Sequence, residues 1–192
     1  MPKTRFKYCL LVGWAENRWK TSDLVSILAA RGATQTNNPD IADVVIGHSA
    51  GCHHIRPAKN QKLLLLIGPL YGRQPLFIRT SQEWFFDSLY YFKKGLVIKW
   101  LLKNIYYLYF GLRHPQVTLK VYRQVRKPLP AKAINSYKKV LVVRNSRDHF
   151  CERSIQELVK TWPAASLVQP EGHHDDLWTN PRLYVDLIIK EL

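Results

Sequence analysis

Five short apolar runs alternate with stretches of helical spacing along this chain. The runs of strand length are residues 8–12, 44–46, 63–67, 140–143 and 166–168. The stretches with helical spacing are residues 19–31, 50–59, 151–162 and 181–192. A continuous run such as Leu-Leu-Leu-Leu-Ile at 63–67 is typical of a strand that is covered on both faces. The alternation therefore predicts an α/β fold around a parallel sheet.

Residues 79–127 interrupt this alternation, because they contain no clear strand. They are rich in aromatic side chains and hold ten basic and two acidic residues, a net +8 out of the chain's +15. A chain of 192 residues is of a size usual for one domain with its own core. We therefore expect one α/β core made of residues 1–78 and 128–192, with a helical cap inserted at residues 79–127, called the insertion below.

A G-x-S-x-G motif directly follows the second apolar run, as Gly47-His48-Ser49-Ala50-Gly51. Small residues around the serine allow a tight turn from strand to helix that holds Ser49 in a strained backbone conformation with its hydroxyl exposed. The N-terminus of the following helix, near Ala50, directs free N–H groups to the same place. This pattern predicts a nucleophilic serine.

A nucleophilic serine needs a base, and the base needs a carboxylate that orients it. Asp148 lies in the segment just after the apolar run 140–143, and His173 and His174 follow the run 166–168. Open parallel sheets build their sites at the carboxyl ends of their strands. We therefore expect Ser49, Asp148 and one of the two histidines to meet there.

In their order along the chain, these motifs resemble the α/β-hydrolase family. The matching segments are the nucleophile elbow at 47–51, the acid loop at 146–148 and the histidine loop at 172–174. The resemblance covers everything except the insertion. It implies that Ser49 is the nucleophile of a Ser-Asp-His triad, Asp148 its acid and one histidine its base. It also implies an oxyanion hole made by the backbone amides of Ala50 and Trp14.

Two histidines compete for the role of the base. In many relatives the base lies about seven residues before a proline that opens the last helix, and His174 has that spacing to Pro181. His173 directly follows Gly172, which resembles the commoner Gly-His form. The spacing favours His174, with His173 as the alternative base.

The chain is short for this family, because no strand precedes the run 8–12. The two N-terminal antiparallel strands of the full fold therefore look absent, and residues 33–38 would form a short edge strand. We expect a truncated α/β-hydrolase fold with a mostly parallel sheet of about six strands, helices on both faces and the helical cap insertion.

The resemblance implies a serine hydrolase that cleaves a carboxylic ester or thioester with an apolar acyl group through an acyl-enzyme on Ser49. An acyltransferase differs only in the acceptor. A non-catalytic docking protein on a hydrolase scaffold is the other alternative, motivated by the missing strands and by Val12, which stands where such enzymes usually have a histidine. No cofactor or metal is expected.

Residues 95–112 of the insertion approach a membrane span in length, but Lys99 and Lys103 fall in the middle, where charges are costly. Two interpretations remain. One is a helix over the active site with its lysines outward. The other is an interfacial helix whose aromatic face enters the headgroup region while Lys93, Lys94, Lys99 and Lys103 meet anionic lipid.

Nucleic acid is not expected as a partner, because no zinc-finger, RNA-binding or helix-turn-helix signature accompanies the basic residues. The three cysteines, Cys9, Cys52 and Cys151, include no C-x-x-C spacing. A reducing compartment is the simplest interpretation. We expect a cytoplasmic protein, peripheral at the membrane in the second interpretation of the insertion.

Overall fold

Six parallel strands form the centre of the molecule. The computed structural model describes residues 5–14, 18–58, 63–71, 75–93 and 95–192. Within these ranges the strand order is β2-β1-β3-β4-β5-β6, and every neighbouring pair is parallel. The strands are β1 (Phe6–Leu11), β2 (Ala33–Gln35), β3 (Val44–His48), β4 (Leu63–Ile67), β5 (Lys139–Val143) and β6 (Ala165–Val168). The predicted six-stranded α/β sheet is confirmed.

Apolar side chains cover both faces of the sheet. Strands β3 and β4 are buried along their whole length. Because successive side chains point to opposite faces, Leu64 and Leu66 pack in one core cluster, whereas Leu63, Leu65 and Ile67 pack in the other. The continuous apolar run of β4 therefore contributes side chains to both core clusters.

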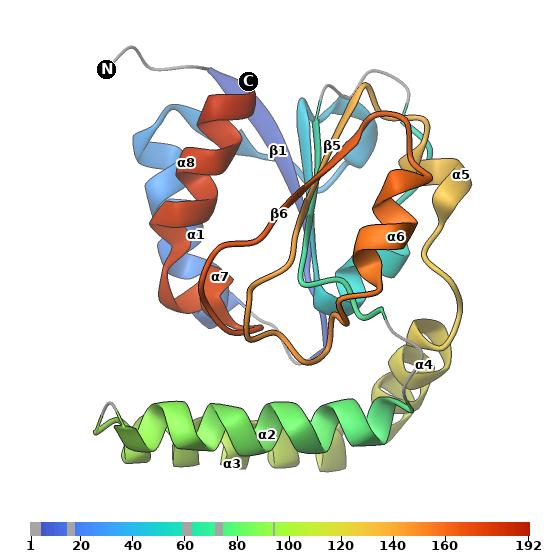
Figure 1. Cartoon of the computed structure of the whole chain (residues 1–192). Helices are drawn as coiled ribbons and strands as arrows, with labels where there is room; N and C mark the ends of the chain where they lie inside the picture. The colour runs from blue at the N-terminus through green and yellow to red at the C-terminus, as the bar shows by residue number, and fades with distance from the viewer. Residues whose placement is uncertain (1–4, 15–17, 59–62, 72–74, 94) are drawn as a thin grey trace.

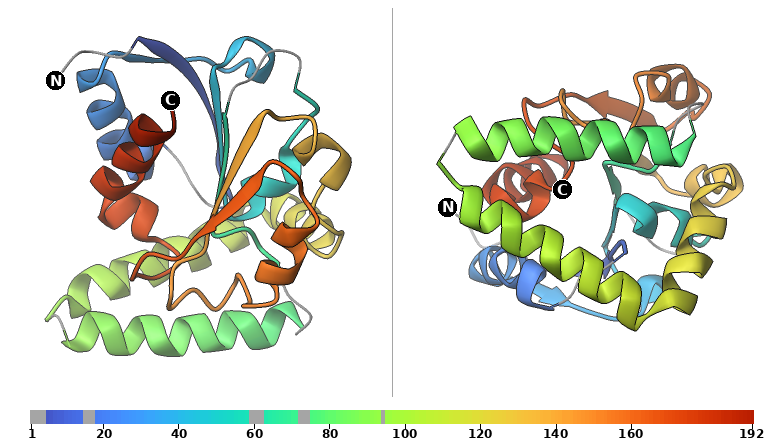
Figure 2. Two further views of the ribbon diagram at one scale, coloured as in Figure 1. Left: turned by 45° about the horizontal axis from the view of Figure 1, so that its top comes forward. Right: turned by 90° about the horizontal axis from the view of Figure 1, so that it is seen from below.

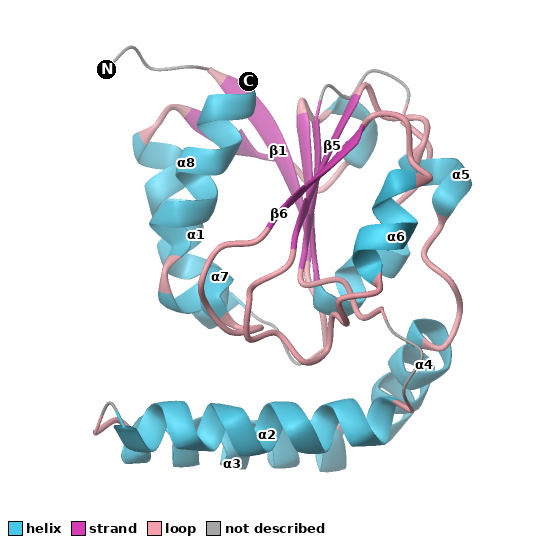
Figure 3. Cartoon of the chain, viewed as in Figure 1, coloured by secondary structure: helices cyan, strands magenta, loops and turns pink. Residues whose placement is uncertain are grey.

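Helices cover both faces, as predicted (Figures 1 and 3). On one face α1 (Arg18–Ala30) and α8 (Pro181–Glu191) pack against the sheet, beside the short α7 (Asp176–Thr179). On the other face lie the 3-10 helix η2 (Ser49–His54), α5 (Ala131–Ile134) and α6 (Ile155–Lys160). A further 3-10 helix, η1 (Pro39–Ile41), leads into β3.

Two expected helices are shorter than their sequence pattern indicates. The helix expected over residues 50–59 ends at His54 as η2, because Ile55 is extended (φ −59°, ψ 132°) two residues before Pro57. The helix expected over residues 151–162 begins only at Ile155. Cys151 instead forms an isolated parallel bridge with Tyr71.

Three helices span the insertion, namely α2 (Leu76–Lys93), α3 (Val97–Arg113) and α4 (Pro115–Val125). Figure 1 shows α2 and α3 lying across one end of the sheet, and Figure 2 (right) looks directly onto them. Their contacts with the segments that follow β5 and β6, described below, place them at the carboxyl ends of the strands. Among the described helices, none is long and apolar enough to cross a membrane.

Candidate active site

Ser49 has the strained backbone that the G-x-S-x-G motif predicts. Its φ is 55°, and no other described non-glycine residue has a positive φ. Such a conformation costs about 1–3 kcal/mol and persists only where the surrounding structure holds it. Gly51 contributes to this support because it allows a close approach of η2 to β1. A Cβ at position 51 would collide with the carbonyl oxygens of Leu11 and Val12. The glycine therefore lets η2 pack against the end of β1.

Asp148 and His174 form a hydrogen-bonded pair at the carboxyl ends of the strands. The distance between His174 Nδ1 and Asp148 Oδ2 is 3.0 Å, and both side chains are buried. The other carboxylate oxygen, Oδ1, accepts hydrogen bonds from the backbone amides of Phe150 at 2.9 Å and Cys151 at 3.0 Å. With Nδ1 turned to the carboxylate, Nε2 of His174 is the ring atom left to exchange a proton with a substrate.

The histidine loop lies directly beside the elbow. The ring Nε2–H of His48, the residue before Ser49, donates to the backbone carbonyl oxygen of His174 at 3.1 Å, and the two rings are 5.1 Å apart. Gly68, just after β4, has a φ of 49°. A Cβ on Gly68 would lie 2.8 Å from Asp148 Oδ2 and 2.9 Å from His174 Nδ1, so only glycine fits this close approach.

His173 is turned away from Asp148. Its ring packs on Tyr90 with the centroids 4.4 Å apart, and neither buried ring nitrogen has a hydrogen-bond partner among the described residues. Its backbone carbonyl oxygen accepts a hydrogen bond from the Nδ2 group of Asn145, which also bonds to the hydroxyl of Tyr184 at 2.8 Å. The structure therefore brings His174, and not His173, to the carboxylate.

The two expected oxyanion donors lie in different surroundings. Ala50 is buried in η2, next to Ser49. Trp14 follows β1, and its indole N–H donates to the Thr118 hydroxyl at 3.0 Å while its ring packs on Tyr107 and Phe110 of α3. The side chain of Trp14 thus contacts the insertion, and the role of its backbone amide stays a prediction.

Two residues of α2 that the sequence did not single out hold the acid loop in place. Arg79 donates through Nη1 to the carbonyl oxygen of Phe150 at 2.7 Å, and Glu83 Oε2 accepts the backbone N–H of His149 at 2.9 Å. Both are buried, as is Asp87, one turn further along α2. A charged residue at every fourth position of an otherwise aromatic helix is the sequence signal that marks this inner face.

The buried carboxylates raise the pKa values of this site. Burial and the neighbouring charge of Asp148 raise the pKa of Glu83 to about 8. Burial alone would lower the pKa of His174, but its contact with Asp148 and the nearby Glu83 outweigh this effect and raise the pKa to about 9. The neighbouring carboxylates therefore favour the protonated form of the His174 imidazole.

Lys103 corrects the expectation that the lysines of α3 point outward or toward lipid. Its side chain is only 18% exposed and forms ion pairs with Asp87 at 3.0 Å and Asp175 at 2.6 Å. The hydroxyl of Tyr107 also donates to Asp175 Oδ2 at 3.3 Å. Because Asp175 directly follows His174 and lies at the start of α7, these bonds connect α3 to the end of the histidine loop.

Three other lysines were also expected to face outward or to meet anionic lipid. Lys93 and Lys99 are exposed. Lys94 lies outside the described residues.

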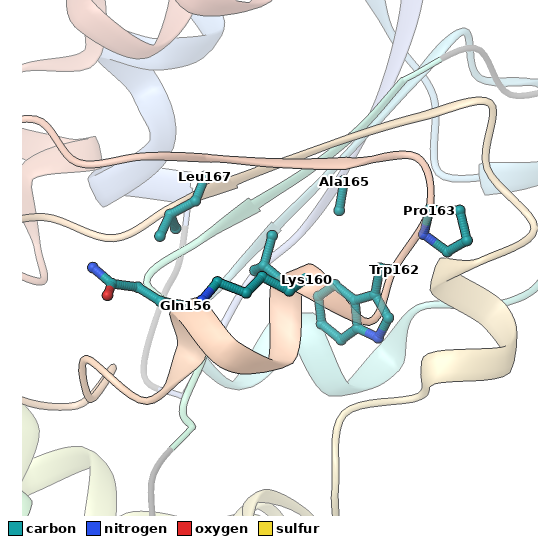
Figure 4. Close-up of a pocket in the computed structure, with 7 residues that line it drawn as sticks. Gln156, Lys160, Trp162, Pro163, Ala165 and Leu167 are labelled. Carbon is teal, nitrogen blue, oxygen red and sulfur yellow. The ribbon is translucent and has the colours of Figure 1, made fainter.

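The described residues offer no metal-ligand cluster beside the candidate triad, and one of their pockets lies away from it. Among the described residues, no group of three or more histidine, cysteine, aspartate or glutamate side chains is placed to hold a metal ion. An open pocket of about 470 Å³ lies between α6 and β6 (Figure 4), with a lining that includes Gln156, Trp162 and Leu167. None of its lining residues belongs to the elbow, the acid loop or the histidine loop.

Comparison with known proteins identifies the architecture. No protein-family model and no curated protein match the sequence. An α/β-hydrolase enzyme from a Medee basin deep-sea metagenome library has a similar structure, with a TM-score of 0.68 at 10% identity over 100% of this chain and 90% of that chain. The chain has the α/β-hydrolase fold.

Two further structures with this fold show its range. An esterase from Exiguobacterium antarcticum gives a TM-score of 0.66 at 10% identity, covering 98% of this chain and 92% of that chain. The thioesterase domain from the curacin biosynthetic pathway gives 0.58 at 12% identity, covering 98% and 92%. At these identities the likeness concerns the α/β-hydrolase fold alone.

Proposed function

We propose that this protein is a serine hydrolase with Ser49 as nucleophile, His174 as base and Asp148 as acid. The observation that carries the proposal is the 3.0 Å hydrogen bond between His174 and Asp148, placed beside a serine with a φ of 55°. A strained serine at a strand-to-helix turn and a buried carboxylate–imidazole pair are the components that acyl transfer requires.

The proposed reaction uses these groups in turn. Ser49 Oγ forms a bond to the carbonyl carbon of the substrate as His174 Nε2 takes the hydroxyl proton. Asp148 holds the ring and stabilises its positive charge. The amides of Ala50 and Trp14 hold the oxyanion. His174 then protonates the leaving alcohol or thiol, and a water molecule, activated by His174, hydrolyses the acyl-enzyme.

We propose esters or thioesters with an apolar acyl group as the substrate class. Aromatic rings support this choice, since Phe150 lies 4.8 Å from the His174 ring and Phe86 of α2 stacks on His149 at 4.5 Å. The insertion would act as a cap that closes the acyl pocket, supported by the contacts of Glu83 and Lys103 with the loops of the site. The solved structures with this fold include an esterase and a thioesterase domain.

A fluorophosphonate probe tests the nucleophile directly. We expect labelling of the folded wild type and none of Ser49→Ala, whereas Ser146→Ala, which removes an exposed serine of the acid loop, labels normally. A chain-length series of nitrophenyl esters on the same three proteins then tests the acyl pocket. Absence of labelling in the folded wild type would instead favour a non-catalytic protein on this scaffold.

A further inference from the structure

The two long helices of the insertion turn their polar sides inward and their apolar sides outward. In α2 the buried positions include Arg79, Glu83 and Asp87. Exposed positions of the same helix carry the large apolar side chains Trp84, Phe85, Leu89 and Phe92, whereas the partly exposed Phe86 stacks on His149. This is the reverse of the pattern expected for a helix that packs on a protein core with its other side in water.

Helix α3 repeats this inversion. Its inward residues include Lys103, paired with two carboxylates, and Asn104, whose side chain donates to the Trp100 carbonyl oxygen at 2.8 Å. Its outward stripe consists of Ile98, Leu101, Leu102, Ile105, Leu108 and Leu112. Ile98 is 75% exposed and Leu112 is 74% exposed, so water surrounds most of each side chain.

The insertion holds almost all of the large apolar residues that are exposed in the described part of the chain. Of nineteen large apolar residues that are exposed, seventeen lie between Trp84 and Tyr122, and the other two are Ile41 and Leu192. Figure 2 (right) shows α2 and α3 at the front of the molecule, where they lie close together at one end and diverge toward the other. Aromatic rings connect the two helices, since the ring of Trp100 in α3 is 5.6 Å from that of Trp84 and 5.7 Å from that of Phe92 in α2. So many exposed apolar side chains on neighbouring helices mark an interaction site, because isolated soluble proteins rarely expose large apolar patches.

The charges around this surface indicate which kind of partner would bind it. Lys93, Lys99 and Arg113 are exposed on α2 and α3, and Lys120 and Arg123 are exposed on α4. The two acidic residues of the insertion are Glu83 and Asp87, both buried, so its outer side carries positive charge. A second copy of this face would bring like charges together, whereas an anionic lipid surface would neutralise them.

We propose that the outer face of α2 and α3 docks on an anionic lipid bilayer. The aromatic and aliphatic side chains enter the boundary between headgroups and acyl chains, with both helices lying in the membrane plane, and the flanking bases contact lipid phosphates. The inner sides of the same helices contact the acid and histidine loops through Glu83 and Lys103. The docked face therefore belongs to the side of the molecule that carries the site.

Vesicle flotation tests this surface without relying on catalysis. The test uses the full chain with Ser49→Ala, so a failure of the hydrolase proposal leaves its result unaffected. We expect flotation with phosphatidylcholine vesicles that contain phosphatidylglycerol, and much weaker flotation with phosphatidylcholine alone. Raising the salt concentration should weaken binding, because the exposed charges are screened.

Two pairs of substitutions separate the apolar and the basic contributions. Replacing Ile98 and Leu112 by glutamine should lower binding to the anionic vesicles at least about tenfold. The same replacement of Ile41 and Leu192, which are exposed outside the insertion, should leave this binding unchanged. Replacing Lys99 and Arg113 by glutamine should lower binding about 30-fold. The matched control replaces two exposed bases outside the insertion, Lys138 and Lys190.

Three outcomes would overturn the proposal. The first is no flotation of the folded parent with anionic vesicles, and the second is equal binding to neutral and anionic vesicles. The third is self-association in sedimentation that the Ile98→Gln, Leu112→Gln pair abolishes while vesicle binding is absent. That third result would assign the face to a second copy of the chain.

Discussion

Glu83 of α2 accepts the backbone N–H of His149 at 2.9 Å, and this bond holds a second buried carboxylate beside the Asp148–His174 pair. The carboxylate comes from the insertion, whereas the pair belongs to the core. The protonation of the proposed base therefore depends on a residue outside the α/β core.

Removing that carboxylate should change the pH dependence of activity. The base works only when neutral, so kcat/KM of the wild type should rise with pH through a value near 9, the pKa of His174. In Glu83→Gln the amide oxygen can still accept the His149 N–H, but the negative charge is lost, so the pKa of His174 should fall and the rise should move to lower pH. The difference should be largest above pH 8, where the Glu83 carboxylate of the wild type is ionised.

A pH profile of nitrophenyl ester hydrolysis measures this change. Glu157→Gln is the control, because that side chain is 74% exposed on α6 and should leave the profile unchanged. An unchanged profile in Glu83→Gln would show that this carboxylate does not influence the base.

The two histidines should differ sharply when each is replaced by glutamine. His174→Gln removes the ring that bonds to Asp148, so kcat should fall by about 10³-fold or more. His173→Gln changes a side chain that packs on Tyr90 and leaves the bond between His174 and Asp148 in place, so kcat should change less than about tenfold. Hydrolysis rates with circular dichroism of both variants test this, and equal losses in two folded variants would contradict it.

Gly68→Ala should damage the site more than it damages the fold. The new Cβ would lie within 3 Å of both Asp148 and His174, so it should displace the pair and lower kcat about 100-fold. Gly95→Ala provides the matched control, since Gly95 also has a positive φ, 68°, but a Cβ there would meet no described atom within 4 Å. It should cost about 1 kcal/mol of stability and no activity.

Thermal unfolding and ester hydrolysis separate these two effects. If Gly95→Ala loses as much activity as Gly68→Ala, then backbone strain, and not the contact with the pair, explains the loss.

Lys103→Met should destabilise the protein by about 3 kcal/mol. The substitution removes the cation shared by the buried carboxylate of Asp87 and the largely buried carboxylate of Asp175, and a buried charge that loses its ion-pair partner is costly. The loss should shrink as the pH falls and these carboxylates take up protons. Lys99→Met, at an exposed position of α3, should have little effect. Urea denaturation at several pH values measures both variants, and equal stability of the two would contradict a role for the buried pairs.

The sequence predicts the central strands well because these strands are buried on both faces and are therefore continuously apolar. The run at 63–67 becomes β4 with the expected bounds, and the elbow at Ser49 has the expected strained backbone. Both features depend on a few neighbouring residues, so local patterns determine them. The expected helix at 50–59 fails for an equally local reason, since Pro57 favours an extended chain before it.

The orientation of α3 could not be predicted from the sequence, because this helix reverses the usual rule. Periodicity identifies α3 as a helix with an apolar stripe and normally assigns that stripe to the core. Here the stripe faces outward, and Lys103 turns inward to carboxylates from α2 and from the histidine loop. That choice depends on partners far away in the chain, so no local pattern reveals it.

The ion pair between Lys103 and Asp175 also links two distant parts of the molecule mechanically. Asp175 directly follows His174, and Lys103 lies in the same helix as the exposed Ile98 and Leu112. A sideways or outward movement of α3 would therefore pull on the residue next to the proposed base. A displacement of the outer surface would be transmitted to the His174 imidazole through the ion pair between Lys103 and Asp175 and the peptide bond between Asp175 and His174.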